Sequence, residues 1–464
     1  MKMKILVFWP ALREEMPKVL FVLAIAGAAF AYGTMVAQYK LFPYSIIRAG
    51  SIALITVYEQ SLSEAADSRR FEMTEGAIRP EDRWHTESPD AGHENFLVAG
   101  GPWAFREYCP EHGCLAVEFN RSGAMIRAYP FRPEQLDLKL IHGLPYEQVV
   151  FDYAKHSYPF GIMQMQGGDL IAVFQNVGTF PDGGGVARIR PNGEMVWFRH
   201  DYTHHWPMPG RPGEILLTTA AVLGQEISVA MPQGYAIPLH CDGRILDGVI
   251  LSIDENGKEL ERISVLDAVR NSPYRGVLIE TVRGCDPLHL NYVTRLGVAA
   301  GTSGTYSPDD FLISMRHINA LMILDAKTHR VKDMIRGTFV FQHAAQPWKD
   351  GKILLYDNMG GGHGGGPSRL LAYDLVTRRE ETIFPRGNYP SDVKPFSYSA
   401  ADVSISETGD RALMAVPMAG LGYEVRLSDG AILAKFDNLH NIDSGSPGKS
   451  ARYYLTGFQY ARRK

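Results

Sequence analysis

A β-hairpin pattern recurs six times between residues 115 and 436. Each copy joins an apolar strand to a second strand through a short turn containing Gly, Asn, Asp or Thr. Successive copies are 71, 63, 71, 49 and 54 residues apart, and most have a further apolar strand just upstream. Three to four strands per unit, repeated six times, predict an all-β fold, a six-bladed β-propeller. The copies begin at Leu115, Val186, Val249, Ala320, Arg369 and Tyr423.

The composition is that of a folded chain with a large apolar core. Hydrophobic residues make up 45% and charged residues 21% of the 464 residues, which excludes a disordered chain and a protein with many membrane spans. The chain contains 46 Gly, 28 Pro and 11% aromatic residues, and many turns combined with many aromatics favour β-structure. A formal net charge of −4 gives no electrostatic basis for binding nucleic acid.

The four cysteines are too few for a disulfide-rich scaffold. Cys109 and Cys114 are close enough in sequence for a local disulfide, which is compatible with an oxidising compartment. The other two are Cys241 and Cys285. No C-x-x-C motif is present, so the cysteines do not predict a zinc site.

An uncharged apolar segment occupies residues 19–39. Its 21 residues, at 1.5 Å rise per helical residue, span the roughly 30 Å hydrocarbon core of a bilayer. The apolar core of a signal peptide has only roughly 7–15 residues, so we expect an uncleaved single-pass anchor rather than a cleaved signal. Lys2, Lys4, Arg13 and Lys18 precede the span, whereas only Lys40 and Arg48 follow soon after it. The positive-inside rule then places residues 1–18 in the cytoplasm and the propeller in the periplasm or outside the cell.

A charged and polar stretch separates the anchor from the repeats. Residues 40–95 contain one short apolar run and many charged residues, and we expect them to form a juxtamembrane segment and linker. The repeats assign residues 96–464 to the propeller.

Histidine and arginine residues precede strands of four different predicted blades. Because the innermost strands of a propeller converge on a central channel, residues at equivalent places in different blades meet in space. Arginine offers a planar fork of donors that matches sulfate or phosphate oxygens. Histidine can donate a hydrogen bond, move a proton or act as a nucleophile. The candidates for chemistry are His204, His205, His289, Arg316 and His343, with Asn291 and His317 as candidates for substrate binding.

Two other interpretations of these residues stay open. Each histidine taken alone can cap a turn or satisfy a backbone carbonyl without any functional role. A cluster of three histidines can also bind Zn, Cu or Fe, although the fixed charge of Arg316 opposes a cation beside it. We therefore predict neither a metal nor a cofactor.

Three short motifs resemble the bacterial periplasmic, arylsulfate-dependent arylsulfotransferases. They are His289-x-Asn291, SMRHINALMILD around Arg316, and FQHAAQPWKDGKILLYDN around His343. The resemblance runs from about residue 186 to residue 382. It implies a six-bladed propeller that transfers a sulfuryl group from a small aryl sulfate to a phenolic acceptor without a cofactor.

The resemblance also implies a role for each candidate. By it, His343 attacks the sulfur atom and carries the group as a sulfohistidine, while His289 and Arg316 bind the sulfate oxygens. One of His204 and His205, with His205 favoured, exchanges protons with the phenols.

The chain departs from the family pattern in three places. Ala344 follows His343 where an acidic residue is expected, and 27 residues separate His289 from Arg316. Too few residues separate the anchor from Leu115 for the N-terminal β-sandwich of the soluble members. We therefore carry two further hypotheses: a membrane-tethered propeller that binds a ligand or acts as a scaffold without catalysis, and a metal- or cofactor-dependent oxidoreductase.

Overall fold

The computed structural model consists of two compact units, Met1–Asp67 and Ser68–Lys464. The structure describes residues 8–39, 42, 70–75, 80–88, 92–101, 104–136, 138–140, 150–152, 157–176, 181–230, 236–241, 244–280, 285–301, 304–349, 351–360, 367–386, 395–441 and 449–462. Most of the predicted linker, residues 40–95, therefore lies outside the described residues.

The first unit contains one long helix, α1 (Phe8–Tyr39). The segment Met16–Val36, 21 residues with a mean hydropathy of 2.1, is long and apolar enough to cross a membrane. Its large apolar side chains are exposed within the unit, with Phe21 66% and Phe30 76% accessible. Such a surface is stable only in an apolar environment.

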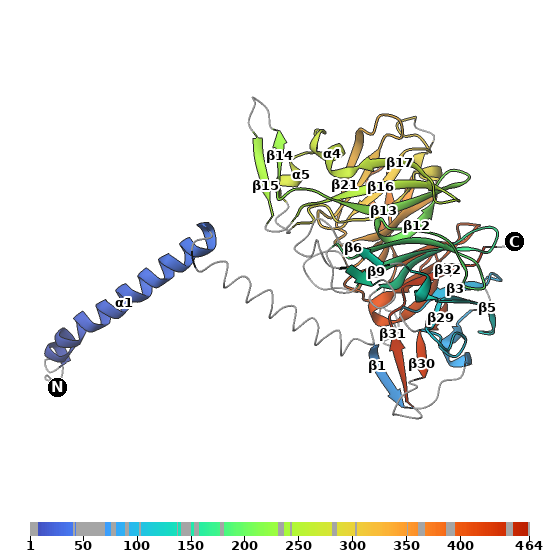
Figure 1. Cartoon of the computed structure of the whole chain (residues 1–464), viewed down its shortest axis with the longest axis horizontal. Helices are drawn as coiled ribbons and strands as arrows, with labels where there is room; N and C mark the ends of the chain where they lie inside the picture. Colours follow the sequence, from blue (N-terminus) through green and yellow to red (C-terminus); the bar gives the residue numbers. More distant parts are fainter. Residues whose placement is uncertain are drawn as a thin grey trace. The chain divides into compact units, whose positions relative to one another are not determined.

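The second unit is a six-bladed β-propeller (Figure 1). Blade 1 contains β32 (Gly457–Tyr460), β3 (Phe96–Ala99), β4 (Cys114–Phe119) and β5 (Met125–Pro130). Blade 2 contains β8 (Ser157–Gln164), β9 (Leu170–Asn176), β10 (Gly183–Ile189) and β11 (Met195–Arg199). Blade 3 contains β12 (Tyr202–Pro209), β13 (Glu214–Val222), β16 (Leu246–Asp254) and β17 (Glu259–Ser264).

The remaining three blades repeat the antiparallel order. Blade 4 contains β18 (Leu290–Arg295), β19 (Phe311–Met315), β20 (Ala320–Leu324) and β21 (Val331–Arg336). Blade 5 contains β22 (His343–Lys349), β23 (Lys352–Asp357), β24 (Arg369–Asp374) and β25 (Glu380–Phe384). Blade 6 contains β26 (Asp402–Ile405), β27 (Arg411–Val416), β28 (Leu421–Arg426), β29 (Ile432–Asp437) and, as a fifth strand, β2 (Trp84–Thr86).

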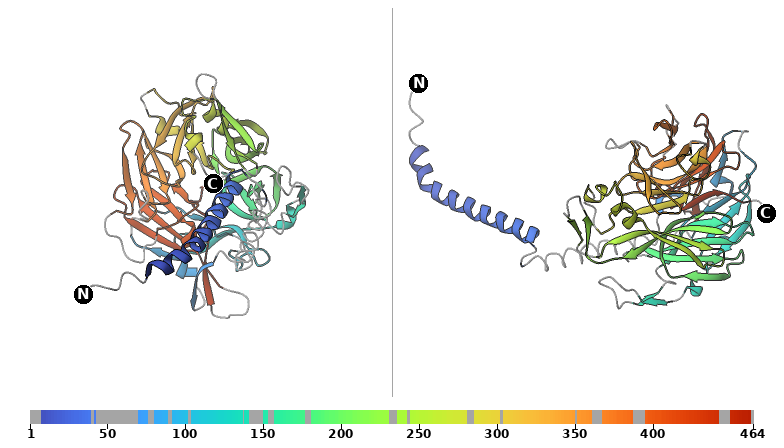
Figure 2. Two further views of the ribbon diagram at one scale, coloured as in Figure 1. Left: turned by 90° about the vertical axis from the view of Figure 1, so that its left-hand side faces the viewer. Right: turned by 90° about the horizontal axis from the view of Figure 1, so that it is seen from above.

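This arrangement confirms the predicted fold. Each predicted hairpin forms the third and fourth strands of one blade, counted from the centre, as β4–β5 does in blade 1 and β28–β29 in blade 6. The blades follow one another around a common centre in sequence order (left view of Figure 2). Blade 1 takes its inner strand, β32, from the C-terminal end of the chain, and this pairing with β3 closes the ring. Because the ring is closed, each blade packs between two neighbouring blades.

The first strands of the six blades line the centre. Each one contacts the first strand of the next blade, and β32 contacts β8 to complete the circle. Apolar and aromatic side chains from these strands form one buried cluster that includes Phe160, Trp206, Tyr292 and Ala344. These side chains pack against one another around the centre of the propeller.

Several shorter elements connect or flank the six blades. They are β1 (Arg70–Glu75) paired with β31 (Lys449–Tyr453) and β30 (Leu439–Asn441), β6 (Leu138–Leu140) with β7 (Val150–Asp152), β14 (Glu226–Ala230) with β15 (Ala236–His240), α4 (Val265–Arg270), α5 (Val277–Glu280), and the short 3-10 turns Pro80–Arg83, Pro133–Gln135, Gly297–Ala300 and Pro417–Ala419.

All four cysteines form disulfides. Cys109 is bonded to Cys114, as the sequence allowed. Cys241, which follows the β14–β15 hairpin, is bonded to Cys285 across 44 residues, a pairing that the sequence did not suggest. Both bonds are compatible with an oxidising compartment.

Candidate active site

Backbone irregularities in the inner strands set the positions of the site residues. β8, β12, β18 and β22 each contain a register shift characteristic of a β-bulge, at Pro159/Gly161, His204/Met208, Leu290/Tyr292 and His343/Gln346. His205 (φ 63°) and His289 (φ 49°) also adopt left-handed backbone conformations, which non-glycine residues rarely do. A bulge redirects the side chains around it and is common next to active sites.

His343 begins β22 and is 1% exposed. Its Nδ1 lies 2.9 Å from the carbonyl oxygen of Phe341 and 2.8 Å from Oδ1 of Asn358. The amide of Asn358 is oriented by its own Nδ2, which donates to the carbonyls of Ser397 and Ala400. Both neighbours of Nδ1 are thus acceptors, so Nδ1 carries the proton and Nε2 carries a lone pair.

Asp286 binds two of the predicted histidines. Its Oδ1 accepts the backbone N–H of His289 at 3.0 Å, and its Oδ2 lies 2.6 Å from Nδ1 of the same residue. Its carbonyl oxygen lies 2.6 Å from Nδ1 of His317. The two imidazole rings are 4.5 Å apart between centroids.

His204 and His205 lie on β12, and their Nδ1 atoms form a hydrogen bond with each other. The ring of His205 lies between the other candidates, with centroids 5.3 Å from His289 and 5.8 Å from His343. Gly161 of β8 supports this position because its Cα faces the carbonyl group of His205. A Cβ at residue 161 would lie only 2.0 Å from that carbonyl oxygen.

Arg316 lies in the turn between β19 and β20 and is buried, at 9% exposure. Its guanidinium carbon lies 4.2 Å from the ring centroid of Phe341 and 5.5 Å from that of Tyr398. Its backbone N–H donates to the carbonyl of His289. Stacking on two aromatic rings holds the planar cation in one orientation.

Asn291 connects the His289 and His343 segments. It is fully buried, and its Nδ2 donates to the carbonyl of Gln342 at 2.7 Å. The structure therefore places this predicted substrate-binding residue behind the site, where it contacts the backbone next to His343.

A cavity of about 420 Å³ opens beside these residues. Four of the predicted site residues line it, namely His204, His205, His289 and His317. Asp286, Cys285 and Asp247 also line it. His343 and Arg316 are not among the described residues that line it.

Burial keeps most of these imidazoles neutral. Burial lowers the pKa of His343 to about 3, with smaller contributions from the charges of Arg316 and His289. Burial also lowers the pKa of His204 to about 3 and that of His317 to about 4. Burial raises the pKa of Asp286, but the charge of His289 and its hydrogen bond outweigh this effect and lower that pKa to about 2. Near neutral pH the site therefore contains a carboxylate and at least three neutral imidazoles.

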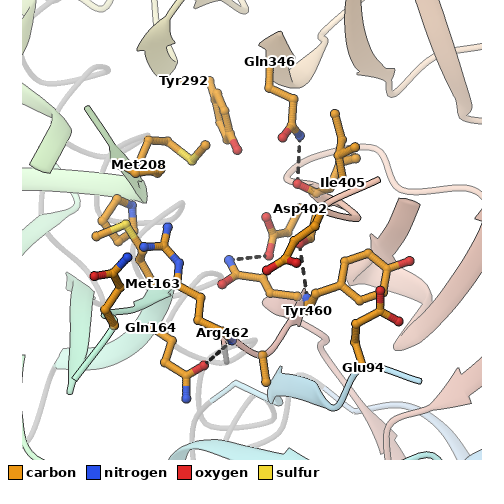
Figure 3. A pocket seen from close by; sticks show the side chains of 18 residues that line it. Glu94, Met163, Gln164, Met208, Tyr292, Gln346, Asp402, Ile405, Tyr460 and Arg462 are labelled. Atoms are coloured by element: carbon orange, nitrogen blue, oxygen red, sulfur yellow. Dashed lines mark hydrogen bonds between the residues drawn. The ribbon is translucent and has the colours of Figure 1, made fainter. Parts of the chain in front are cut away.

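A second cavity, of about 430 Å³, lies toward the C-terminal ends of the inner strands (Figure 3). Tyr292, Gln346 and Asp402 extend into it, and burial raises the pKa of Asp402 to about 7. None of the predicted site residues lines this second cavity, and among the described residues the two cavities share no lining residue.

The structure thus brings His204, His205, His289, His317, Arg316 and His343 together at one end of the inner strands. Two partners were not candidates from the sequence. Asp286 precedes His289 by three residues and contacts it locally, whereas Asn358 reaches His343 through the pairing of β22 with β23.

No curated protein matches the chain. Similar solved structures include a protein of unknown function from Bacteroides caccae, at 10% identity over 79% of this chain and 98% of that chain with a TM-score of 0.41. A catalytically inactive virginiamycin B lyase from Staphylococcus aureus with quinupristin is 10% identical over 64% of this chain and 94% of that chain, with a TM-score of 0.35. The Pan2 WD40 domain of Neurospora crassa is 12% identical over 76% of this chain and 85% of that chain, also with a TM-score of 0.35. At such TM-scores these likenesses carry no argument about function.

One family model matches the sequence. It is described as Arylsulfotransferase (ASST), and the match covers residues 164–394. These residues run from the end of β8 to beyond β25 and include every predicted site residue. The chain therefore belongs to an arylsulfotransferase-like family.

Proposed function

We propose that the protein is a membrane-anchored arylsulfotransferase that moves a sulfuryl group from an aryl sulfate to a phenolic acceptor through His343. The hydrogen bonding of His343 carries this proposal. Two acceptors at Nδ1 fix the proton there, and burial keeps the ring neutral with a pKa of about 3. A neutral imidazole with a free lone pair on Nε2 is the form that acts as a nucleophile.

In the first half-reaction, Nε2 of His343 attacks the sulfur atom of the aryl sulfate. The new N–S bond forms as the bond between sulfur and the phenolic oxygen breaks, and that electron pair leaves on the phenolate. The product on the protein is a sulfohistidine with Nδ1–H still bound to Asn358 and Phe341. In the second half-reaction a phenol gives its proton to a neighbouring site histidine and attacks the same sulfur. The N–S bond breaks with its electron pair going to Nε2, and the neutral imidazole is restored.

Positive charge near His343 supports the handling of an anion. Arg316 is close enough to contribute to the lowered pKa of His343, and its guanidinium is held by Phe341 and Tyr398. Such fixed donors stabilise charge that develops on the sulfuryl oxygens. In this proposal Arg316 contacts those oxygens, His289 contacts the oxygen that joins the sulfur atom to the aryl ring, and the aryl group occupies the cavity lined by the other histidines.

The helix supports the proposed location. Residues 19–39 anchor the protein, residues 1–18 lie in the cytoplasm, and the propeller acts in the periplasm or outside the cell. Two disulfides in the propeller fit an oxidising compartment.

The test is an exchange assay with the full chain. The protein is given 4-nitrophenyl sulfate and phenol, and phenyl sulfate is followed by mass spectrometry while nitrophenol release is followed by absorbance. We expect both products in equal amounts and parallel double-reciprocal plots, as a covalent intermediate requires. His343→Asn should abolish both products.

Saturable binding of the aryl sulfate without any product, in a folded protein, would contradict the proposal and support the ligand-binding or scaffold hypothesis. A metal bound to the purified protein, together with no sulfuryl transfer, would support the oxidoreductase hypothesis.

A further inference from the structure

Asp286 differs from every other partner of the site histidines because it is charged. The described partners of Nδ1 in His343 and His317 are carbonyl and amide oxygens, which are neutral. The partner of Nδ1 in His289 is the Asp286 carboxylate at 2.6 Å. A carboxylate at hydrogen-bonding distance stabilises the protonated, charged form of an imidazole, whereas a neutral oxygen does so far less.

The remaining histidines are poor proton donors. Burial lowers the pKa of His204 to about 3 and that of His205 well below the ordinary value, so both are neutral near pH 7. A neutral imidazole does not give up a second proton under these conditions. His317 shares this state, with a pKa of about 4.

His289 also lies where a proton is needed. It lines the same cavity as His204, His205 and His317, and 26% of its side chain is accessible. Because Nδ1 is bound to Asp286, the atom left for the cavity is Nε2.

We propose that Asp286 is the positioning residue that holds His289 as the proton donor to the departing phenolate, an inference that rests on the proposed function. As the bond between sulfur and oxygen breaks, the proton on Nε2 of His289 moves to the phenolate oxygen, and His289 becomes neutral with Nδ1–H still on Asp286. When the acceptor phenol attacks the sulfohistidine, Nε2 takes the phenolic proton. The cycle returns His289 to its starting state, and it assigns to His289 the proton transfer that the sequence assigned to His204 or His205.

The disulfide and a backbone hydrogen bond fix Asp286 in place. Cys285, the preceding residue, is bonded to Cys241, and its carbonyl accepts the N–H of Leu246 at 2.7 Å. The carboxylate is thereby tied to β16 of blade 3, while the histidine that it orients immediately precedes β18 of blade 4.

The experiment compares two donors with leaving groups of different basicity. Phenol has a pKa of about 10, like the tyrosine side chain, and needs a proton when it leaves. The nitrophenolate from 4-nitrophenyl sulfate is a much weaker base and leaves unaided. Substitution of the acid should therefore harm phenyl sulfate more than 4-nitrophenyl sulfate.

We expect Asp286→Asn to lower kcat/KM for phenyl sulfate by about 100-fold or more, the usual contribution of general acid catalysis. For 4-nitrophenyl sulfate we expect a loss of less than about 10-fold, since no proton is required. Asp286→Glu keeps a carboxylate and should recover part of the lost selectivity.

Asp247→Asn is the matched control. Asp247 lines the same cavity, but its Oδ1 accepts the backbone N–H of Leu266. This variant should change the two donors by the same factor. Circular dichroism and intact-protein mass without reductant confirm that each variant is folded and retains both disulfides.

An Asp286→Asn variant that loses the same factor with both donors contradicts the inference and leaves the proposed function intact. Absence of transfer from either donor in the unsubstituted protein contradicts the proposed function, and the inference falls with it.

Discussion

The substitution Gly161→Ala changes the site without removing any group that takes part in the chemistry. A methyl group at residue 161 would lie 2.0 Å from the carbonyl oxygen of His205 and 2.8 Å from Cα of Trp206. Ordinary contact begins at 3.4 Å, so β8 and β12 must separate by about 1.4 Å at this point. His205 already has a strained backbone, with φ 63°, and has little freedom to adjust.

A displacement of about 1 Å in a positioned group can lower a rate by about 100-fold. We therefore expect Gly161→Ala to lower kcat/KM for 4-nitrophenyl sulfate by about that factor. Overpacking should lower the free energy of unfolding by about 1–3 kcal/mol, which leaves the protein folded. Initial-rate kinetics and urea denaturation measure the two effects.

Gly167→Ala is the control, because a Cβ at residue 167 would have no atom within 4 Å. It should leave both quantities unchanged. A folded Gly161→Ala variant with unchanged kcat/KM would refute the argument that contact between β8 and β12 sets the position of His205.

Three further predictions follow from the same contacts. Asn358→Asp places a carboxylate 2.8 Å from Nδ1 of His343, which should raise the pKa of His343 from about 3. As a result, kcat/KM should increase with pH across the neutral range. A pH profile of kcat/KM identical to that of the unsubstituted protein would contradict this prediction. Replacing Cys241 and Cys285 by serine should lower the free energy of unfolding by about 4 kcal/mol, and replacing Cys109 and Cys114 by serine should lower it by about 2 kcal/mol, because the disulfides close loops of 44 and 5 residues. Only the first replacement should also lower activity. Equal effects of the two replacements in urea denaturation and in activity assays would contradict the role of the Cys241–Cys285 bond in holding Asp286. Finally, the pKa values of His204, His343 and His317 are lowered in the folded protein, so below about pH 6.5 these residues bind protons in the unfolded chain but not in the folded one. The urea midpoint should therefore fall as the pH is lowered from 6.5 toward 4. A midpoint that rises over this range would contradict burial of neutral histidines.

The blade architecture could be predicted because its signal is local. Alternating apolar residues around a short turn mark a hairpin wherever they occur, and six copies at similar spacing fit few folds. The fifth strand of blade 6, β2, could not be found this way. It comes from the segment predicted to be a linker and pairs with β29 some 350 residues away, so no local pattern records the contact.

The residues that form the candidate site could be predicted from the sequence, but the groups that hydrogen-bond to them could not. The site residues come from three adjacent blades, with His204 and His205 on β12 of blade 3 and His343 at the start of β22 in blade 5. His289 and Arg316 both belong to blade 4, so the expectation that they come from different blades was wrong. The proton on Nδ1 of His343 depends on Asn358, whose position follows from strand register. The bond between Cys241 and Cys285 depends on where the β14–β15 hairpin ends. Contacts of this kind arise from the folded arrangement of blades and have no signature in the nearby sequence.

The central claim is that His343 carries the sulfuryl group. Brief incubation with 4-nitrophenyl sulfate in the absence of an acceptor, followed by intact-protein and peptide mass spectrometry, tests it directly. The account predicts one added sulfuryl group, located on the peptide that contains His343 and absent from the His343→Asn variant. A sulfuryl group that persists in His343→Asn, or that lies on another residue, would contradict it.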